Sequence, residues 1–299
     1  MKANTPSRTA QYMALFRAIE TEQPANKRIF TDKYAINFLD KGLKITTKIS
    51  GLPIMCSLIP KIIHNKARGA LSSGIARTKF IDDLLLYTIQ NGIGQVVILG
   101  AGFDTRAHRL DFLKEIPVIE IDHPDTSNFK TKKLKQTGQL KENIRYLQLD
   151  FNKENLNDFV QQNKIDFTVP TTIIWEGVTN YLTQESIDKT FEFISRFSKN
   201  SFIIFTYIHK QVFDNETTFE GTEKLFKNLK RNEEVWTFGF LPSELKKYLQ
   251  RFGMTLLDDK GAAEYREKYI PERKGLLNGY EFYRVAFAKL TLKNDKDTI

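Results

Sequence analysis

The sequence predicts an α/β fold in which a mostly parallel sheet of seven strands carries helices on both faces. Short apolar, β-branched runs alternate with longer stretches through residues 91–299, a pattern typical of strands joined by right-handed helical crossovers. Residues 96–99 are apolar throughout, as in a strand that a parallel sheet buries on both faces. Residues 1–90 are predicted to be mostly helical and contain no repeat.

The remaining strands follow from similar short runs. The last two are expected to form an antiparallel hairpin at the sheet edge, joined by a charged and mobile linker at 258–279. Residues 1–90 are assigned to an N-terminal helical cap, and residues 91–299 to the sheet domain. The seven expected strands are 96–99, 117–122, 144–149, 171–175, 201–207, 254–257 and 280–289.

Two segments do not fit the alternation of strands and helices, the apolar stretch 43–63 and an insertion at about 208–240. Both are predicted to form a lid over a ligand cleft. Lysines and prolines interrupt residues 43–63, unlike in a membrane-spanning helix. This stretch has two alternative interpretations, contact with a second subunit or with a membrane surface, and the oligomeric state is left open.

A glycine turn follows the strand at 96–99, where the chain reads Gly100-Ala101-Gly102. A strand that ends in Gly-x-Gly and opens a helix is typical of the nucleotide-binding turn of a Rossmann-like sheet, because glycine lets a ligand approach bare main chain. Thr105 occupies the third glycine position of the dinucleotide fingerprint, which argues against NAD or FAD. From this segment alone, a turn that binds nothing is the alternative.

Two acidic residues lie on the second strand. Asp122 lies about 20 residues beyond the glycine turn, where a carboxylate that binds a ribose is expected. Glu120 points to the same side of the strand because side chains alternate with a period of two. At least one of them is expected to bind a ligand; the alternative is that both cap the strand in solvent.

The third and fourth strands also end in acidic residues. Asp150 is placed to accept a hydrogen bond from an adenine amino group, with Phe151 against the base, although Asp150 also suits the N-cap of a helix at 152–161. Glu176 follows the fourth strand and is expected near the reacting atoms. Tyr181, in the same loop, is a candidate catalytic residue or an ordinary packed ring.

The stretches 100–110, 120–124 and 175–182 resemble the leucine carboxyl methyltransferase family. They read Gly-Ala-Gly-Phe-Asp-Thr-Arg-Ala-His-Arg-Leu, Glu-Ile-Asp-His-Pro and Trp-Glu-Gly-Val-Thr-Asn-Tyr-Leu. The closer resemblance is to its bacterial branch of S-adenosylmethionine-dependent O-methyltransferases. Residues 76–83 and the N-terminal segments 7–10, 17–20 and 30–35 extend the similarity over nearly the whole chain. Lys33 departs from the family, which usually has proline there; this bears on the cap and not on the cofactor.

The resemblance implies a class I methyltransferase fold with S-adenosyl-L-methionine as the cofactor. Arg77 would hold the carboxylate of its methionine part, a role that the residues alone do not indicate, because most cations before an apolar helix are solvated. Asp122 would bind the ribose and Glu176 would lie by the methionyl part. The catalytic candidates are Glu176 and Tyr181, with no metal. The candidate cofactor contacts are Arg77, Gly100, Ala101, Gly102, Asp104, Arg106, Glu120, Asp122, Asp150, Phe151 and Glu176.

Composition limits the classes of function. The net charge of +9 suits anionic ligands, but the basic run at 130–141 has only Phe129 beside it, whereas a nucleic-acid groove interleaves cations with aromatic rings. A single cysteine excludes an internal disulfide and, with no signal peptide evident, favours the cytoplasm. The four histidines show no metal-ligand spacing.

The expected reaction is in-line transfer of a methyl group to an oxygen of a small molecule. A carboxylate acceptor needs no general base, whereas a hydroxyl needs one, for which Glu176 and Tyr181 are candidates. An NAD-binding Rossmann-type oxidoreductase and a non-catalytic methyltransferase-like scaffold are the alternatives. Thr105 speaks against the first, and the intact set of Arg77, Asp122, Asp150 and Glu176 speaks against the second.

Overall fold

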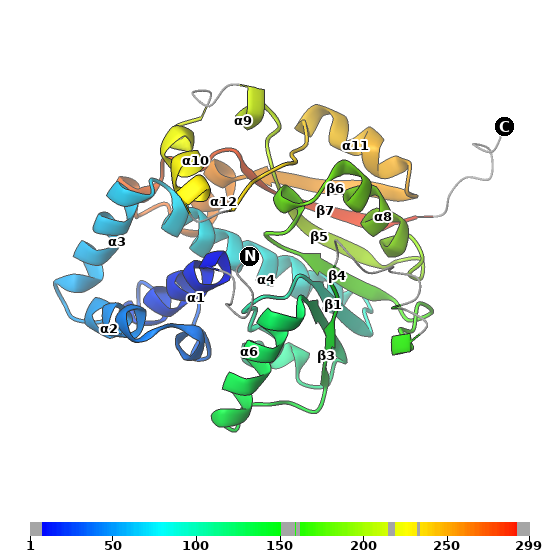
Figure 1. The fold of residues 1–299 in the computed structure, drawn as a ribbon, viewed down its shortest axis with the longest axis horizontal. Helices are drawn as coiled ribbons and strands as arrows, with labels where there is room; N and C mark the ends of the chain where they lie inside the picture. Colours follow the sequence, from blue (N-terminus) through cyan, green and yellow to red (C-terminus); the bar gives the residue numbers. More distant parts are fainter. Residues whose placement is uncertain (1–7, 151–158, 160–161, 215–218, 232–233, 292–299) are drawn as a thin grey trace.

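A seven-stranded sheet forms the centre of the computed structural model, which describes residues 8–291 except 151–158, 160–161, 215–218 and 232–233 (Figure 1). Its strand order is β3-β2-β1-β4-β5-β7-β6. Strand β7 runs antiparallel to both β5 and β6, and the other neighbouring pairs are parallel. The predicted fold class, including the antiparallel edge pair, is therefore confirmed. The strands are β1 (Gln95–Leu99), β2 (Val118–Asp122), β3 (Ile144–Gln148), β4 (Thr171–Trp175), β5 (Phe202–Ile208), β6 (Met254–Gly261) and β7 (Tyr283–Leu290).

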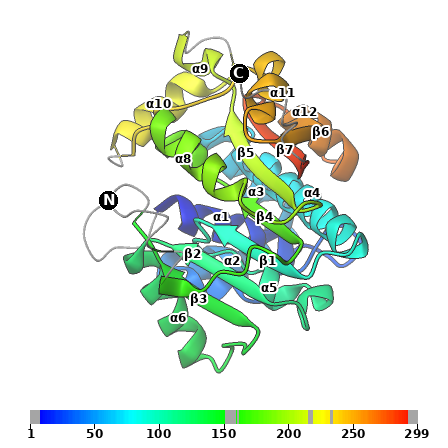
Figure 2. The ribbon, with the colours of Figure 1, turned by 90° about the vertical axis from the view of Figure 1, so that its right-hand side faces the viewer.

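Helices cover both faces of this sheet, and further helices lie beyond the strand ends (Figures 1 and 2). The α-helices are α1 (Arg8–Thr21), α2 (Lys41–Ser50), α3 (Met55–Lys66), α4 (Ala70–Gln90), α5 (Arg106–Arg109), α6 (Pro124–Gln136), α8 (Gln184–Ile194), α9 (Gln211–Asp214), α10 (Thr222–Arg231), α11 (Pro242–Gln250) and α12 (Ala262–Tyr269). The 3-10 helices are η1 (Ala35–Phe38), η2 (Asp111–Leu113), η3 (Thr179–Tyr181) and η4 (Lys274–Leu276). Within the described parts of the chain, no helix is long and apolar enough to cross a membrane.

Strand β1 shows why an unbroken apolar run is needed at the centre. Val97 and Leu99 pack into the cluster that holds α8 and α11, whereas Val96 and Ile98 pack into the cluster that holds α4 and α12. Successive side chains of a strand point to opposite faces, so both sets must be apolar when both faces are covered.

The N-terminal helices form two groups. Helix α4 packs on one face of the sheet through residues such as Phe80 and Leu85. The predicted boundary at residue 90 therefore separates the sheet from a helix that packs directly on it. Helix α1 contacts η1, α2 and α4, and α2 and α3 lie outside it at the edge of the molecule (Figure 1).

The linker prediction for residues 258–279 was wrong. Strand β6 continues to Gly261, and α12 follows it and packs against α4. Tyr265 and Arg266 are fully buried, and Arg266 donates hydrogen bonds to Gly279 O and, at 2.8 Å, to Glu281. Composition misled because the charged residues lie on the outer side of a short helix, while the one buried cation has partners. The last strand also begins later than expected, at Tyr283.

The two ends of the segment at 208–240 lie side by side at the end of β5. Lys210 N–H donates to Phe240 O at 2.9 Å, and Phe240 N–H donates to Ile208 O at 3.0 Å. Helices α9 and α10 lie between these two ends, so the segment is an insertion with a hydrogen-bonded stem.

Candidate functional site

The glycine turn lies directly against the end of β2. Gly100 N–H donates to Ile121 O at 2.8 Å, Ala101 N–H donates to the same oxygen at 3.2 Å, and Gly102 N–H donates to an Asp122 carboxylate oxygen. The other Asp122 oxygen accepts from His123 N–H at 2.7 Å. Burial raises the pKa of Asp122, and these backbone donors oppose the shift. The structure thus brings Asp122 to the glycine turn, as the spacing predicted.

Gly100 and Gly102 both require glycine for conformational reasons, with φ of +64° and +50°. Gly100 also meets the loop after β4, because a Cβ atom there would lie 2.3 Å from Val178 Cγ2. The loops that follow β1 and β4 are therefore in direct contact at the centre of the site.

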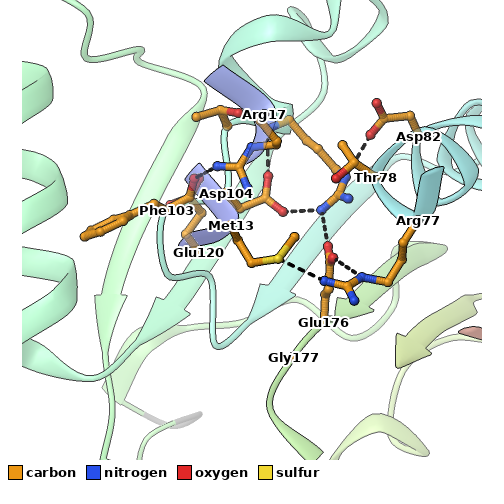
Figure 3. A network of polar contacts seen from close by, with 12 residues as sticks. Met13, Arg17, Arg77, Thr78, Asp82, Phe103, Asp104, Glu120, Glu176 and Gly177 are labelled. Carbon is orange, nitrogen blue, oxygen red and sulfur yellow. Dashed lines mark hydrogen bonds and ion pairs between the residues drawn. The ribbon is translucent and has the colours of Figure 1, made fainter. Parts of the chain in front are cut away.

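Glu176 is held between two arginines at the end of β4 (Figure 3). Arg77 Nε donates to Glu176 Oε1 at 2.8 Å, and Arg106 Nη1 lies 2.9 Å from Glu176 Oε2. Burial alone would raise the pKa of Glu176, but Arg106 and Arg77 hold it below its usual value. Glu176 is therefore ionised at neutral pH, which disfavours it as a proton donor.

Arg106 continues this network away from Glu176. It donates to Asp82 at 2.9 Å and pairs with Asp104. Burial would raise the pKa of Asp104, but the charge of Arg106 outweighs burial and holds this pKa below its usual value. Asp82 also accepts two hydrogen bonds from Arg109, at 2.7 and 2.8 Å. Asp104 and Arg106, both predicted to contact a cofactor, thus have protein partners here.

Arg77 does not precede a helix, as the residues alone suggested, but lies inside α4 with 4% of its surface exposed. Its Nη2 contacts Met13 Sδ at 3.2 Å, and its guanidinium carbon lies 4.3 Å above the Tyr283 ring. Glu176 is thus only one of its contacts in an otherwise apolar and aromatic surrounding. The interpretation of Arg77 as a solvated cation was wrong.

Glu120 lies beside the site in a buried ion pair. Lys130 of α6 donates to Glu120 Oε2 and to Asp104 O, and Lys130 and Glu120 are 1% and 3% exposed. Burial raises the pKa of Glu120 to about 7, against the opposing effect of Lys130. The alternative that Glu120 caps the strand in solvent was therefore wrong, and its predicted cofactor contact stays a prediction.

The predicted adenine end is described only in part. Asp150 follows β3, and its Oδ2 lies 3.6 Å from His123 Nε2 at the neighbouring strand end. Phe151 and most of the helix expected at 152–161 lie outside the described residues.

Tyr181 connects its own loop after β4 with two segments that are distant in sequence. Its hydroxyl lies 3.3 Å from Thr9 Oγ1 of α1 and 3.2 Å from Glu234 Oε2 of the insertion. Thr9 Oγ1 also donates to the same Glu234 oxygen at 2.6 Å. Burial and the nearby Glu234 charge raise the pKa of Tyr181, so the phenol is neutral and donates to the carboxylate.

Sequence reasoning missed several residues of this region. Asp82 lies in the family-like segment 76–83, which alone does not indicate its role. Glu234 and Thr9 have no local signal because their partners are distant in sequence. Tyr283 belongs to an expected strand without being singled out. Tyr280 has φ of +66°, unusual for a bulky side chain, and packs on Tyr283 with a ring distance of 6.3 Å.

Solved structures of low sequence identity share this fold. A protein from Thermobifida fusca described as a methyltransferase aligns with a TM-score of 0.60 at 16% identity, covering 97% of each chain. A DUF574 family protein from Streptomyces avermitilis aligns with a TM-score of 0.56 at 11% identity, covering 95% of this chain and 97% of its own.

Sequence relatives carry names as S-adenosyl-L-methionine-dependent methyltransferases. One from Mycobacterium tuberculosis is 31% identical over 192 residues, 64% of this chain and 61% of its own length. One from Mycolicibacterium smegmatis is 28% identical over 227 residues, 75% of this chain and 74% of its own. The chain thus matches less than two thirds of the length of the first of these relatives. The family model for leucine carboxyl methyltransferase matches residues 10–195, which include the glycine turn, Arg77, Asp122 and Glu176. The chain belongs to the leucine carboxyl methyltransferase family.

Proposed function

We propose that this protein is an S-adenosylmethionine-dependent O-methyltransferase that acts on a small molecule in the cytoplasm. S-adenosylmethionine is the cofactor that the family and the names of the relatives indicate. The observation that carries the proposal is the pairing of Arg77 with Glu176 close to the glycine turn that holds Asp122. These groups match the charged and polar parts of an amino-acid nucleoside.

The residues suit each part of such a cofactor. Asp122 offers a carboxylate to the ribose hydroxyls, and Asp150 lies at the next strand end, where the adenine is expected. Arg77 offers its planar fork to the carboxylate of the methionine part, and Glu176 offers its ionised carboxylate to the ammonium group. The cofactor would supply a methyl group already activated by a positive sulfur, so the protein mainly aligns it and excludes water.

The acceptor side is proposed to lie at Tyr181. The N-terminal helix α1 and the insertion meet there through Thr9 and Glu234, which supports a cover made of both segments. Glu234 is a carboxylate within 3.2 Å of the Tyr181 hydroxyl, so a proton acceptor is close to the site. Its negative charge would oppose a second carboxylate, and this favours a hydroxyl over a carboxylate as the acceptor.

The cofactor assignment predicts opposite selectivity for two variants. Arg77→Lys should weaken the binding of S-adenosylhomocysteine by about 1.5 to 3 kcal/mol, because an ammonium group cannot reproduce the two-pronged contact of a guanidinium with the amino-acid carboxylate. Binding of adenosine, which lacks that carboxylate, should be almost unaffected. Asp122→Ala should weaken both ligands alike, because both contain the ribose. Isothermal titration calorimetry of the two ligands measures this difference.

Thermal unfolding of each variant without ligand is the control for folding. Equal losses of both ligands for Arg77→Lys would show that Arg77 acts through the fold instead. NAD provides a further comparison, since an oxidoreductase would be stabilised by NAD and not by S-adenosylhomocysteine. Thr105 donates a hydrogen bond to Asp32 at 2.6 Å and thereby connects the turn to the N-terminal segment. In a dinucleotide-binding fold a glycine at this position instead allows close packing of helix and strand.

The acceptor assignment predicts that Glu234→Gln reduces turnover of hydroxyl acceptors about 100-fold or more, as expected for loss of a general base. Activity is measured as S-adenosylhomocysteine formed from panels of small phenols, alcohols and carboxylic acids. Tyr181→Phe should reduce the same rates without changing the affinity for S-adenosylhomocysteine. Turnover of carboxylic acids that is unaffected by Glu234→Gln would assign a carboxylate acceptor, and no turnover with any panel would favour the scaffold alternative.

A further inference from the structure

Helices α2 and α3 lie at the edge of the molecule (Figure 1). These helices and the turn between them carry exposed aliphatic side chains. Ile54 between the two helices is 76% exposed, Ile45 on α2 is 59% exposed and Leu52 is 55% exposed. We call this surface the α2–α3 face; it consists of Ile45, Ile49, Leu52, Ile54, Leu58 and Ile62.

The fold does not need these side chains. The opposite sides of the two helices already pack inward, where Leu43, Ile59 and Ile63 meet the cluster that contains Phe38. On the outer side, Ile45 and Ile49 are four residues apart, and so are Leu58 and Ile62, so each pair lies on one side of its helix. Residues 43–63 thus carry apolar side chains on both the inner and the outer side of the two helices. The rest of the protein covers only the inner side.

The charged side chains of α2 and α3 themselves are all positive. Residues 41–81 contain no aspartate or glutamate, and Lys41, Lys48, Lys61 and Lys66 are exposed. Acidic side chains lie at its margin, where Glu220 pairs with Arg68 just beyond α3. Asp40 caps α2 by accepting from Leu43 N–H at 2.9 Å and lies 3.5 Å from Arg8, and Glu22 lies behind Gly51.

We propose that the α2–α3 face docks the protein on an anionic membrane surface. Aliphatic side chains interleaved with lysines are the composition of interfacial helices, whose apolar side enters the boundary between headgroups and acyl chains while the cations meet anionic lipids. The helices, of 10 and 12 residues, would lie along the surface rather than span it.

Two other occupants fit the surface less well. A symmetric contact between two copies of this chain would bring the exposed lysines of both copies into one interface, and no acid on the face compensates for them. A nucleic acid would meet the lysines but would gain little from aliphatic side chains, because bases stack on aromatic rings, and the α2–α3 face has none.

The test is sedimentation of the protein with vesicles of phosphatidylcholine, with and without about one third phosphatidylglycerol. We expect binding to the anionic vesicles and at least about tenfold weaker binding to phosphatidylcholine alone. Two double variants should each bind the anionic vesicles at least about tenfold more weakly than the wild type: Ile54→Ser/Leu58→Ser and Lys48→Glu/Lys61→Glu. Their thermal unfolding should match the wild type, because all four positions are exposed.

A matched control lies on and just after α6, where Lys135 and Leu140 are exposed. Lys135→Glu/Leu140→Ser should bind vesicles like the wild type. An equal loss in this control would assign the binding to the overall positive charge and overturn the proposal. So would absence of vesicle binding, or self-association without lipid that Ile54→Ser/Leu58→Ser abolishes, which would make the face an interface between copies.

Discussion

Replacing Lys130 by methionine is expected to lower the free energy of unfolding by about 3 to 5 kcal/mol at pH 8, because a buried carboxylate then loses its cationic partner. Lys130 and Glu120 are almost fully buried and hydrogen bonded to each other. Methionine fills a similar volume but offers no charge. Urea unfolding at equilibrium measures the change.

The loss should depend on pH in a defined direction. The folded-state pKa of Glu120 is about 7, above its ordinary value of 4.5, so the contribution of Glu120 to stability is fully present below about pH 4.5 and is lost as the pH rises through about 7. Without Lys130 this pKa rises further. The penalty of Lys130→Met should therefore be smaller at pH 5 than at pH 8, by up to about 1.4 kcal/mol, because pH 8 lies one pH unit above the pKa of about 7.

Lys135→Met on the same helix is the control, because Lys135 is exposed and should tolerate the change at either pH. A penalty for Lys130→Met that is the same at both pH values would show that lost packing, and not the unpaired Glu120, causes it.

Gly100→Ala is expected to destabilise the protein by about 2 to 5 kcal/mol and to abolish measurable binding of S-adenosylhomocysteine. Alanine is strained at φ of +64°, and its Cβ would lie 2.3 Å from Val178 Cγ2. The loops after β1 and β4 must then separate, and both carry residues proposed to hold the cofactor. Unfolding and calorimetric titration measure the two effects.

Two further variants separate strain from collision. Gly138 also has φ of +64° but has no atom within 4 Å of an added Cβ, so Gly138→Ala should cost only the strain, about 1 to 2 kcal/mol. Val178→Ala combined with Gly100→Ala should recover most of the stability that Gly100→Ala loses beyond the loss caused by Gly138→Ala. If the double variant is no more stable than Gly100→Ala, the contact with Val178 does not set the cost.

The sheet and the centre of the site could be predicted because their signals are local. A β-branched run such as residues 171–175 becomes β4 with the predicted bounds, and acids at strand ends gather wherever parallel strands end together. Asp122 is the clearest case, since strand pairing alone carries it to the glycine turn.

The remainder depends on contacts that no short stretch contains. Thr9 lies 172 residues from Tyr181 and 225 from Glu234, and only the assembled chain brings them together. The same holds for the burial of Arg77 and Arg266, because polarity predicts exposure unless the partner is known. Helix α12 was missed for this reason.

The chain of ion pairs through Glu176 has a consequence for which ligands the site can admit. Three guanidinium groups, those of Arg77, Arg106 and Arg109, face three carboxylates, those of Asp82, Asp104 and Glu176. The three positive and three negative charges of these side chains cancel. This matters because the groups are buried, where little water is present to screen an unbalanced charge. A zwitterion that places its carboxylate on Arg77 and its ammonium on Glu176 preserves that balance, whereas a simple anion or cation of the same shape upsets it. We therefore expect the network to discriminate by net charge as well as by shape, and to bind deaminated or decarboxylated forms of the proposed cofactor more weakly.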